Sequence, residues 1–397
     1  MTKVIELNVK SNYIAEYKKG YPLINKDTIM NTNALKEEGS IVHLIDENRQ
    51  FITKGYYGKQ NKGLGWVLTH NKTEAIDFAF FKSRLEVALN ARQSFYKNTE
   101  TTAFRVFNGE GDGIGGFTID YFDGYYLINW YSAGIYSFKD HVISAIDELC
   151  DYKAIYEKKR FDTKGQYIDD DDFVKGTRGE FPIIVKENGM NYAVYLNDGA
   201  MVGIFLDQRK VRKAIRDEYS KGKNVLNTFS YTGAFSVAAA HGGAMKTTNV
   251  DLAKRSKSKT IEQFSVNSID YEQQDIKVMD VFEYFKYAKR KELKFDVVVL
   301  DPPSFARSKK HTFSTAKDYP ALIKDTIAIT EKNGVIVAST NNASFGMRKF
   351  KGFVDKAFKE MNTNYKILEE FSLPSDFKTN PIFPQGNYLK VLIVEKR

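Results

Sequence analysis

Polar residues stand at the ends of three short apolar runs in the second half of the chain. The stretch 225–235 reads VLNTFSYTGAF, so a strand-like start passes through a small polar bend into a further apolar run. Residues 246–250 are followed by Asp251, and the stretch 295–305, FDVVVLDPPSF, carries Asp301 and two prolines near its end. Carboxylates accept hydrogen bonds from the hydroxyl and amino groups that a nucleoside offers. The residue types therefore indicate a nucleoside-binding site.

A doubly wound α/β sheet would bring these residues together. The stretch 225–240 has the pattern of a first strand that leads into a first helix, and ligands of such sheets bind at the carboxyl ends of the strands. The continuous β-branched run 295–300 predicts a strand that is buried on both faces. Pro302 and Pro303 have no backbone donors, so the chain should leave this strand in an extended form rather than enter a helix directly.

The glycine content of the bend distinguishes two classes of ligand. A dinucleotide needs G-x-G-x-x-G around its pyrophosphate, whereas this bend has Gly233 alone, with Phe229 and Tyr231 beside it. This disfavours a nucleotide-dependent oxidoreductase. A ligand with an adenosine, a charged amino-acid tail and no phosphates suits the bend better. The bend therefore predicts S-adenosylmethionine as the cofactor.

Several longer motifs resemble the bacterial 23S rRNA cytosine carbon-5 methyltransferases with an N-terminal PUA domain. They are DFAFFKSRL (77–85), EGDGIGGFTIDYF (110–122), FLDQR (205–209), LNTFSYTGAFS (226–236), VD (250–251), MDVF (279–282), LDPPSF (300–305) and PQGNYLKV (384–391). The resemblance covers the whole chain. It implies a β-rich PUA-like RNA-binding domain (1–72), an α+β middle domain (73–185) and a C-terminal Rossmann-like class I methyltransferase domain (186–397). The sheet of the last domain should be mostly parallel, with a reversed edge strand.

The resemblance also implies the residues that contact the cofactor. They are Gln208, Arg209, Asn227, Phe229, Tyr231, Thr232, Gly233, Asp251, Asp280 and Asp301. Backbone amides of the bend would meet the amino-acid part, Gln208 and Arg209 its carboxylate, Asp251 the two ribose hydroxyls and Asp280 the adenine amino group. Asp251 and Asp280 each have a structural alternative as a helix cap. The alternative for Gln208 and Arg209 is a solvent-facing helix start with Asp207 as its N-cap.

The chemistry predicted from the resemblance meets one departure. Carbon 5 of cytosine is a poor nucleophile, and the family activates it with a cysteine thiolate placed after the fifth strand. The matching stretch here, GVIVASTNNAS (334–344), has Asn341 at that place. An exocyclic amine would need no such thiolate: Asp301 and the Pro302 carbonyl could accept its hydrogens while Phe305 stacks on the base. Base N-methylation and an inactive RNA-binding or assembly factor therefore stay open beside cytosine methylation.

Composition limits the partners and the compartment. The net charge of +9 and a pI near 9.1 suit a polyanion, which agrees with 23S rRNA or a large-subunit precursor as partner. No run approaches the roughly 18 apolar residues of a membrane span, and no signal peptide is evident, so a cytoplasmic protein with no membrane partner is expected. One cysteine and five scattered histidines predict no metal site. The oligomeric state is open, with a homodimer as one option.

Other segments are predicted to have structural roles. GDGIGG (111–116) joins two alternating runs and is interpreted as a hairpin turn, not a phosphate loop. Cys150, at the end of a predicted helix, is interpreted as packing, and the four acids 169–172 as an exposed loop. Asn188-Gly189 predicts a hairpin. The resemblance places Gln385 and Gly386 at the border of the substrate pocket.

Overall fold

The chain folds into two compact units in a computed structural model, which describes residues 4–60, 63–161, 172–199, 201–307 and 312–397. The first unit contains Met1–Ile183, Tyr195–Val202 and Ser375–Gly386, and the second contains Ile184–Val194, Gly203–Pro374 and Asn387–Arg397. The division after Ile183 lies close to the predicted start of the catalytic domain. Two later segments nevertheless belong to the first unit, so the two units cannot be separated by a single boundary in the sequence.

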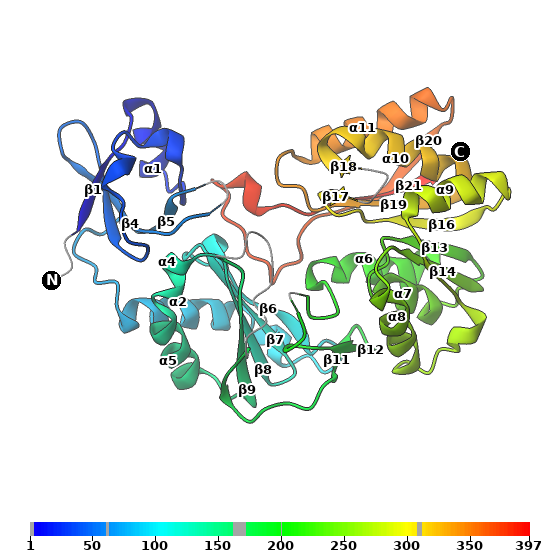
Figure 1. The fold of residues 1–397 in the computed structure, drawn as a ribbon, viewed down its shortest axis with the longest axis horizontal. Coiled ribbons are helices and arrows are strands. Elements are labelled where there is room, and N and C mark those ends of the chain that lie inside the picture. Colours follow the sequence, from blue (N-terminus) through cyan, green and yellow to red (C-terminus); the bar gives the residue numbers. More distant parts are fainter. Residues whose placement is uncertain (1–3, 61–62, 162–171, 200, 308–311) are drawn as a thin grey trace. The chain divides into compact units, whose positions relative to one another are not determined.

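The first unit begins with a small β-rich module, as the family resemblance implied. Its strands are β1 (Ile5–Asn8), β2 (Leu23–Ile24), β3 (Ile41–Ile45), β4 (Phe51–Tyr57) and β5 (Gly65–Thr69), in the sheet order β1-β3-β4-β5-β2 (Figure 1). Helix α1 (Ile14–Lys18) buries Tyr17, whose hydroxyl contacts that of Thr28 at 2.6 Å. Leu7, Val42 and Leu44 form part of the core.

The second module of the first unit is α+β, as predicted. Its strands are β6 (Ala103–Asn108), β7 (Phe117–Phe122), β8 (Tyr125–Trp130), β9 (Ala154–Lys159) and β10 (Phe173–Gly176), in the order β10-β9-β8-β7-β6. Its helices are α2 (Phe78–Ala91), α3 (Gln93–Tyr96), α4 (Ala133–Tyr136) and α5 (Lys139–Leu149). The GDGIGG stretch connects the antiparallel strands β6 and β7, so its interpretation as a hairpin connection is confirmed. Helix α2 starts at Phe78 because the Asp77 carboxylate accepts the Phe80 amide.

One acid of the predicted exposed loop is buried instead. Asp172 is 6% exposed and accepts a hydrogen bond at 2.9 Å from Lys158, which is fully buried. The other acids of that run, 169–171, lie outside the described residues. The prediction was wrong for Asp172 because a charge can be buried when a partner of opposite sign is buried with it.

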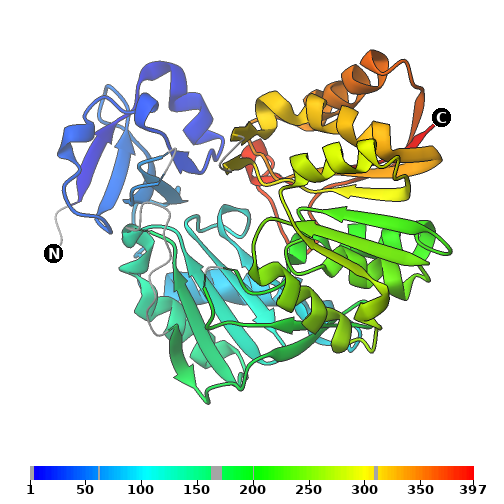
Figure 2. The same cartoon turned by 45° about the vertical axis from the view of Figure 1, so that its right-hand side comes forward.

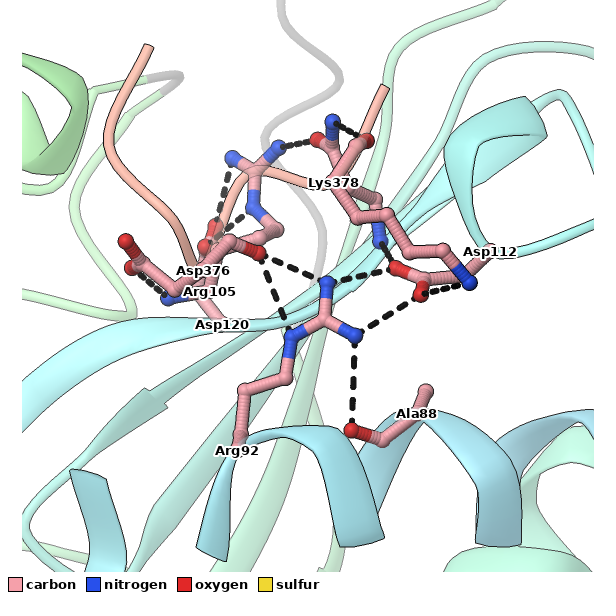
Figure 3. A network of polar contacts seen from close by, with 8 residues as sticks. Ala88, Arg92, Arg105, Asp112, Asp120, Asp376 and Lys378 are labelled. Atoms are coloured by element: carbon pink, nitrogen blue, oxygen red, sulfur yellow. Dashed lines mark hydrogen bonds and ion pairs between the residues drawn. The ribbon is translucent and has the colours of Figure 1, made fainter. Parts of the chain in front are cut away.

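A buried arginine fixes the segment Ser375–Gly386 in the first unit (Figure 3). Arg92 is 1% exposed and donates two hydrogen bonds of 2.7 Å to the carboxylate of Asp112. Its guanidinium also donates to the backbone carbonyl of Asp376 at 2.7 Å, while the Asp376 carboxylate accepts the Arg105 amide at 2.9 Å. Gln385 and Gly386 lie at the end of this anchored segment.

A seven-stranded sheet organises the second unit. Its strands are β13 (Asn224–Thr228), β14 (Lys246–Asp251), β15 (Asp275–Val278), β16 (Phe295–Leu300), β19 (Thr330–Thr340), β20 (Tyr365–Phe371) and β21 (Lys390–Lys396). Their order is β15-β14-β13-β16-β19-β21-β20, and only β21 runs antiparallel to its neighbours. The expected reversed strand is thus present, although it lies one position in from the edge.

Helices cover both faces of this sheet (Figure 2). One face carries α6 (Arg209–Ala214), α7 (Ala234–His241) and α8 (Arg255–Ser265), and the other carries α9 (Val281–Arg290), α10 (Thr315–Ile329) and α11 (Met347–Glu360). Val297 and Val299 pack toward the first set and Val298 and Leu300 toward the second, so β16 is buried on both faces as predicted. The hairpin β11 (Ile183–Glu187) and β12 (Met190–Val194) turns at Asn188-Gly189, which also confirms the sequence pattern.

Candidate active site

The bend after β13 holds an unusual backbone. Phe229 and Tyr231 have φ values of +53° and +51°, and Gly233 has +81°. Bulky residues rarely adopt this left-handed conformation, which costs on the order of 1–3 kcal/mol at each position and is found mainly at functional sites. Gly233 is required for a second reason, because a Cβ there would lie 2.7 Å from Thr260 Cγ2.

Asp251 holds this bend from the end of the neighbouring strand β14. Its Oδ2 accepts the Tyr231 amide at 2.9 Å and its Oδ1 accepts the Ala253 amide at 2.8 Å. Since Lys254 is the N-cap of α8, Asp251 does not cap that helix. A carboxylate has about four acceptor positions, so two remain for ribose hydroxyls.

Asp280 follows β15, beside the strand that carries Asp251. Its Oδ1 accepts the amides of Phe282 at 2.9 Å and Glu283 at 3.4 Å, so it is the N-cap of α9. The structural alternative for this residue is therefore confirmed. The cap uses Oδ1, which leaves Oδ2 for the predicted contact with an adenine amino group.

Gln208 connects the start of α6 with the carboxyl ends of β16 and β19. Its side-chain amide donates to Ser339 Oγ at 2.8 Å and to Asp301 Oδ2 at 3.3 Å. Gln208 is 4% exposed, and its Oε1 has no donor among the described residues. A buried acceptor without a donor is costly, and the ammonium group of an amino-acid ligand would satisfy it. The site thus fits S-adenosylmethionine.

The surroundings of Gln208 correct one alternative. Arg209 is 7% exposed and Gln208 is buried, so this helix start does not face solvent. Asp207 is no N-cap, because it lies inside a short 3-10 turn, Leu206–Gln208, and accepts the Tyr388 hydroxyl at 2.9 Å.

Burial also sets the protonation of Asp301, which follows β16. Desolvation raises the pKa of its carboxyl group to about 6, and the nearby charge of Asp207 acts in the same direction. Hydrogen bonds from Ser339 and Gln208 oppose this shift. Asp301 is consequently ionised at neutral pH but titrates within the range of many assays.

Two predicted cofactor residues, one before the bend and one within it, have buried side chains. Asn227 is fully buried, and its Nδ2 contacts Ser236 Oγ at 3.2 Å and Asn249 Oδ1 at 3.4 Å. Thr232 is 2% exposed and donates to the Gly203 carbonyl at 2.7 Å. In the structure the polar groups of both side chains make hydrogen bonds within the protein. Their direct contact with the cofactor stays a prediction.

Three further polar residues, Ser236, Asn249 and Ser339, belong to this region and were not predicted. All three are fully buried. Ser236 and Ser339 stand within apolar runs, which is a signal in the sequence, whereas Asn249 lies in the mostly polar strand β14 and has no such signal.

The structure brings Asn341 against the turn that contains Asp301. Ser304 Oγ donates to Asn341 Oδ1 at 2.7 Å. Phe305 starts a short hairpin of β17 (Phe305–Arg307) and β18 (Thr312–Ser314), which precedes α10 and was not predicted. Its side chain is 62% exposed, so it is available for stacking. Pro302 is buried.

Cys150 belongs to the first unit and lies far from these residues in sequence. It is a half-buried free thiol at the end of α5, packed against the core of the second module. Burial raises its pKa, which keeps it in the thiol form. Among the described residues, no group of three or more histidines, cysteines or acids could hold a metal ion, and no helix is long and apolar enough to cross a membrane.

Comparison with known proteins agrees with this geometry. Residues 164–382 match the family described as S-adenosylmethionine-dependent methyltransferase, and residues 7–70 match the PUA-like domain. A candidate ribosomal RNA large subunit methyltransferase of Bacillus subtilis (strain 168), YwbD, is 66% identical over 98% of this chain and 99% of its own length. Ribosomal RNA large subunit methyltransferase I of Alteromonas mediterranea is 29% identical over 95% of each chain.

A solved structure extends the likeness to the whole fold. The crystal structure of SMU.776, described as a candidate methyltransferase complexed with SAH, has a TM-score of 0.90 and 39% identity and covers 98% of this chain and 100% of its own. The predicted cofactor and enzyme class are thereby confirmed. The chain belongs to the S-adenosylmethionine-dependent methyltransferases and joins their catalytic domain to a PUA-like domain.

Proposed function

We propose that this enzyme methylates a base of large-subunit ribosomal RNA and that the methyl acceptor is a nitrogen atom. Two relatives that align with nearly the whole chain carry names that specify this RNA. The PUA-like domain and the net charge of +9 support an RNA substrate, because cationic side chains release counterions when they neutralise phosphates.

The contact between Asn341 and Ser304 is the observation that favours a nitrogen atom over carbon 5 as the methyl acceptor. Carbon 5 of cytosine, which the family resemblance predicts, needs a thiolate that adds to the ring. Asn341 stands opposite the D-P-P-S turn, where an amide can hydrogen-bond but cannot form that adduct. Cys150, the one cysteine of the chain, lies in the other unit with a raised pKa. A base nitrogen with its own lone pair needs no covalent catalyst.

The residues of the site divide into cofactor-holding and base-holding groups. Gln208 Oε1 would accept the ammonium group of the cofactor, Asp251 its ribose hydroxyls and Asp280 Oδ2 its adenine amino group. The bound cofactor supplies an activated methyl group on its sulfonium. Asp301 and the Pro302 carbonyl would accept hydrogens of the base, and Phe305 would stack on its face.

Positioning dominates the expected rate gain. Moving a base out of its stack costs a few kcal/mol, and aligning it with the methyl group lowers the barrier by roughly 7 to 11 kcal/mol. Asp301 is suited to hold the base because its carboxyl group is ionised above pH about 6.

The test is methyl transfer from tritiated cofactor to large-subunit RNA, free and in ribosomal particles, from a strain that lacks the gene. Mass spectrometry of the nucleosides should show one new N-methylated base, and Cys150→Ser should retain the wild-type rate. The appearance of 5-methylcytidine would refute the nitrogen acceptor. Binding of RNA without any methyl transfer would instead favour the second candidate, an RNA-binding or assembly factor. The asparagine at position 341, where the family has its catalytic cysteine, also agrees with that candidate.

A further inference from the structure

A cationic cluster lies beside Asn341 in the second unit. Strand β21 begins at Lys390, whose Cα pairs with that of Thr340, the residue before Asn341. The chain continues from Asn341 through Phe345 to the first turn of α11, which carries Arg348 and Lys349. The Phe345 ring lies 5.5 Å from Lys390 Nζ and 5.8 Å from Lys349 Nζ. Lys390, Arg348 and Lys349, called the α11 cluster below, therefore stand on the strand paired next to Asn341 and on the helix that follows it.

Lys390 is an unusual lysine because it is buried without an anion. It is 3% exposed, and its ammonium donates to the backbone carbonyl of Tyr388. No carboxylate forms an ion pair with it among the residues that the structure describes. Burial alone lowers its pKa to about 8. An ammonium that is buried in this way gains from a nearby anion, since opposite charges restore the ionised form.

The start of α11 adds positive potential at the same place. The N-terminal end of a helix carries a partial positive charge, which acids normally complement. Helix α11 has no acid in its first turn and no side-chain cap, but exposed Arg348 and Lys349 instead. A Cβ on the N-cap Gly346 would meet no atom within 4 Å, so the first amides of the helix are approachable. Such a helix end is suited to bind an anion.

We infer that Arg348, Lys349 and the open N-terminus of α11, with the buried charge of Lys390 behind them, bind a backbone phosphate of the RNA strand that carries the target base. This inference rests on the proposed function, because it assumes an RNA substrate. The cluster gives the strand a fixed point next to Asn341 and the D-P-P-S turn. It thereby sets which nucleotide can reach Asp301, and its residues are positioning residues rather than catalytic ones.

The test compares binding of protein-free large-subunit ribosomal RNA at several salt concentrations. A lost phosphate contact should lower the magnitude of the slope of log K against log salt by about 1, so Arg348→Gln with Lys349→Gln, which together remove the one proposed contact, should lower it by about 1. The same pair should weaken RNA binding at least tenfold at physiological salt, and Lys390→Met should weaken it severalfold. All variants should bind S-adenosylhomocysteine like the wild type, which shows that they are folded.

A matched control lies on the same helix. Lys356→Gln with Lys359→Gln removes two exposed cations from the last turns of α11, where both lie near acids, and should leave the RNA slope unchanged. An unchanged slope for the Arg348 and Lys349 variant, or an equal fall in the control, would overturn the phosphate site while wild-type RNA binding persists. If the wild type binds no RNA, the proposed function itself fails.

Discussion

Replacing Asp251 by asparagine should weaken cofactor binding by a predictable amount. In the structure both carboxylate oxygens already accept backbone amides, from Tyr231 and Ala253, and their remaining lone pairs are free to accept hydrogen bonds from the proposed ribose. Asparagine has one acceptor oxygen and would place an NH₂ group against a donor. A hydrogen bond to a charged group is worth about 1.5–3 kcal/mol, so the dissociation constant for S-adenosylhomocysteine should rise roughly 10- to 150-fold.

Titration calorimetry with two ligands separates ribose contact from a loosened bend. The wild type should bind the 2′-deoxy analogue of S-adenosylhomocysteine more weakly than the parent ligand, and Asp251→Asn should lose most of that difference, as a double-mutant cycle requires. Asp275→Asn serves as the control, since Asp275 starts the adjacent strand β15 and forms an exposed pair with Lys246 at 3.1 Å. Equal penalties for the deoxy ligand in wild type and Asp251→Asn would refute the assignment.

Three further substitutions test other features of the structure. Asp301→Asn should abolish the fall of the methylation rate on the acidic side of pH 6. Because folding raises the pKa of the Asp301 carboxyl group from 3.8 to about 6, the stability of the wild type should also fall as pH rises from about 4 to 6. Thermal unfolding of the variant should lack this fall. In a urea titration, Gly233→Ala should lower the free energy of unfolding by about 1–2 kcal/mol, and it should weaken cofactor binding at least tenfold. Gly352→Ala, inside α11 with open space around it, is the control and should raise the free energy of unfolding slightly. Arg92→Leu removes two hydrogen bonds of 2.7 Å from buried Asp112 and leaves it the longer contact of 3.8 Å with Lys378, so this variant should cost about 3–5 kcal/mol of stability. Arg49→Gln, whose native side chain is 77% exposed, should cost at most about 1 kcal/mol, and similar losses in both would contradict the importance of burial.

The local pattern of the sequence predicted most of the fold. The strands and helices of the second unit follow from apolar periodicity, because β-branched runs such as 295–300 and alternating segments have few other stable structures. The positions of Asp251, Asp280 and Asp301 at strand ends followed from the same patterns, since parallel strands end at one edge of a sheet. The asparagine at position 341, where the resemblance predicts a cysteine, is also read directly from the sequence.

Burial and long-range contact could not be predicted in this way. Asp172 has the sequence pattern of one more exposed acid, because its partner Lys158 stands 14 residues away and meets it only in the folded chain. The Ser375–Gly386 segment follows β20 in sequence but belongs to the first unit, through a contact of Arg92 with a carbonyl 284 residues away.

The class of fold and the class of cofactor could be predicted from the sequence, because both depend on residue type and local periodicity. Which polar groups meet is set by the folded chain. Gln208 contacts Ser339 across 131 residues of sequence, Ser304 contacts Asn341, and Lys390 lies buried beside Phe345. The physical reason is that the protonation and pairing of a side chain depend on its burial and its neighbours, which arise when distant strands assemble into one sheet.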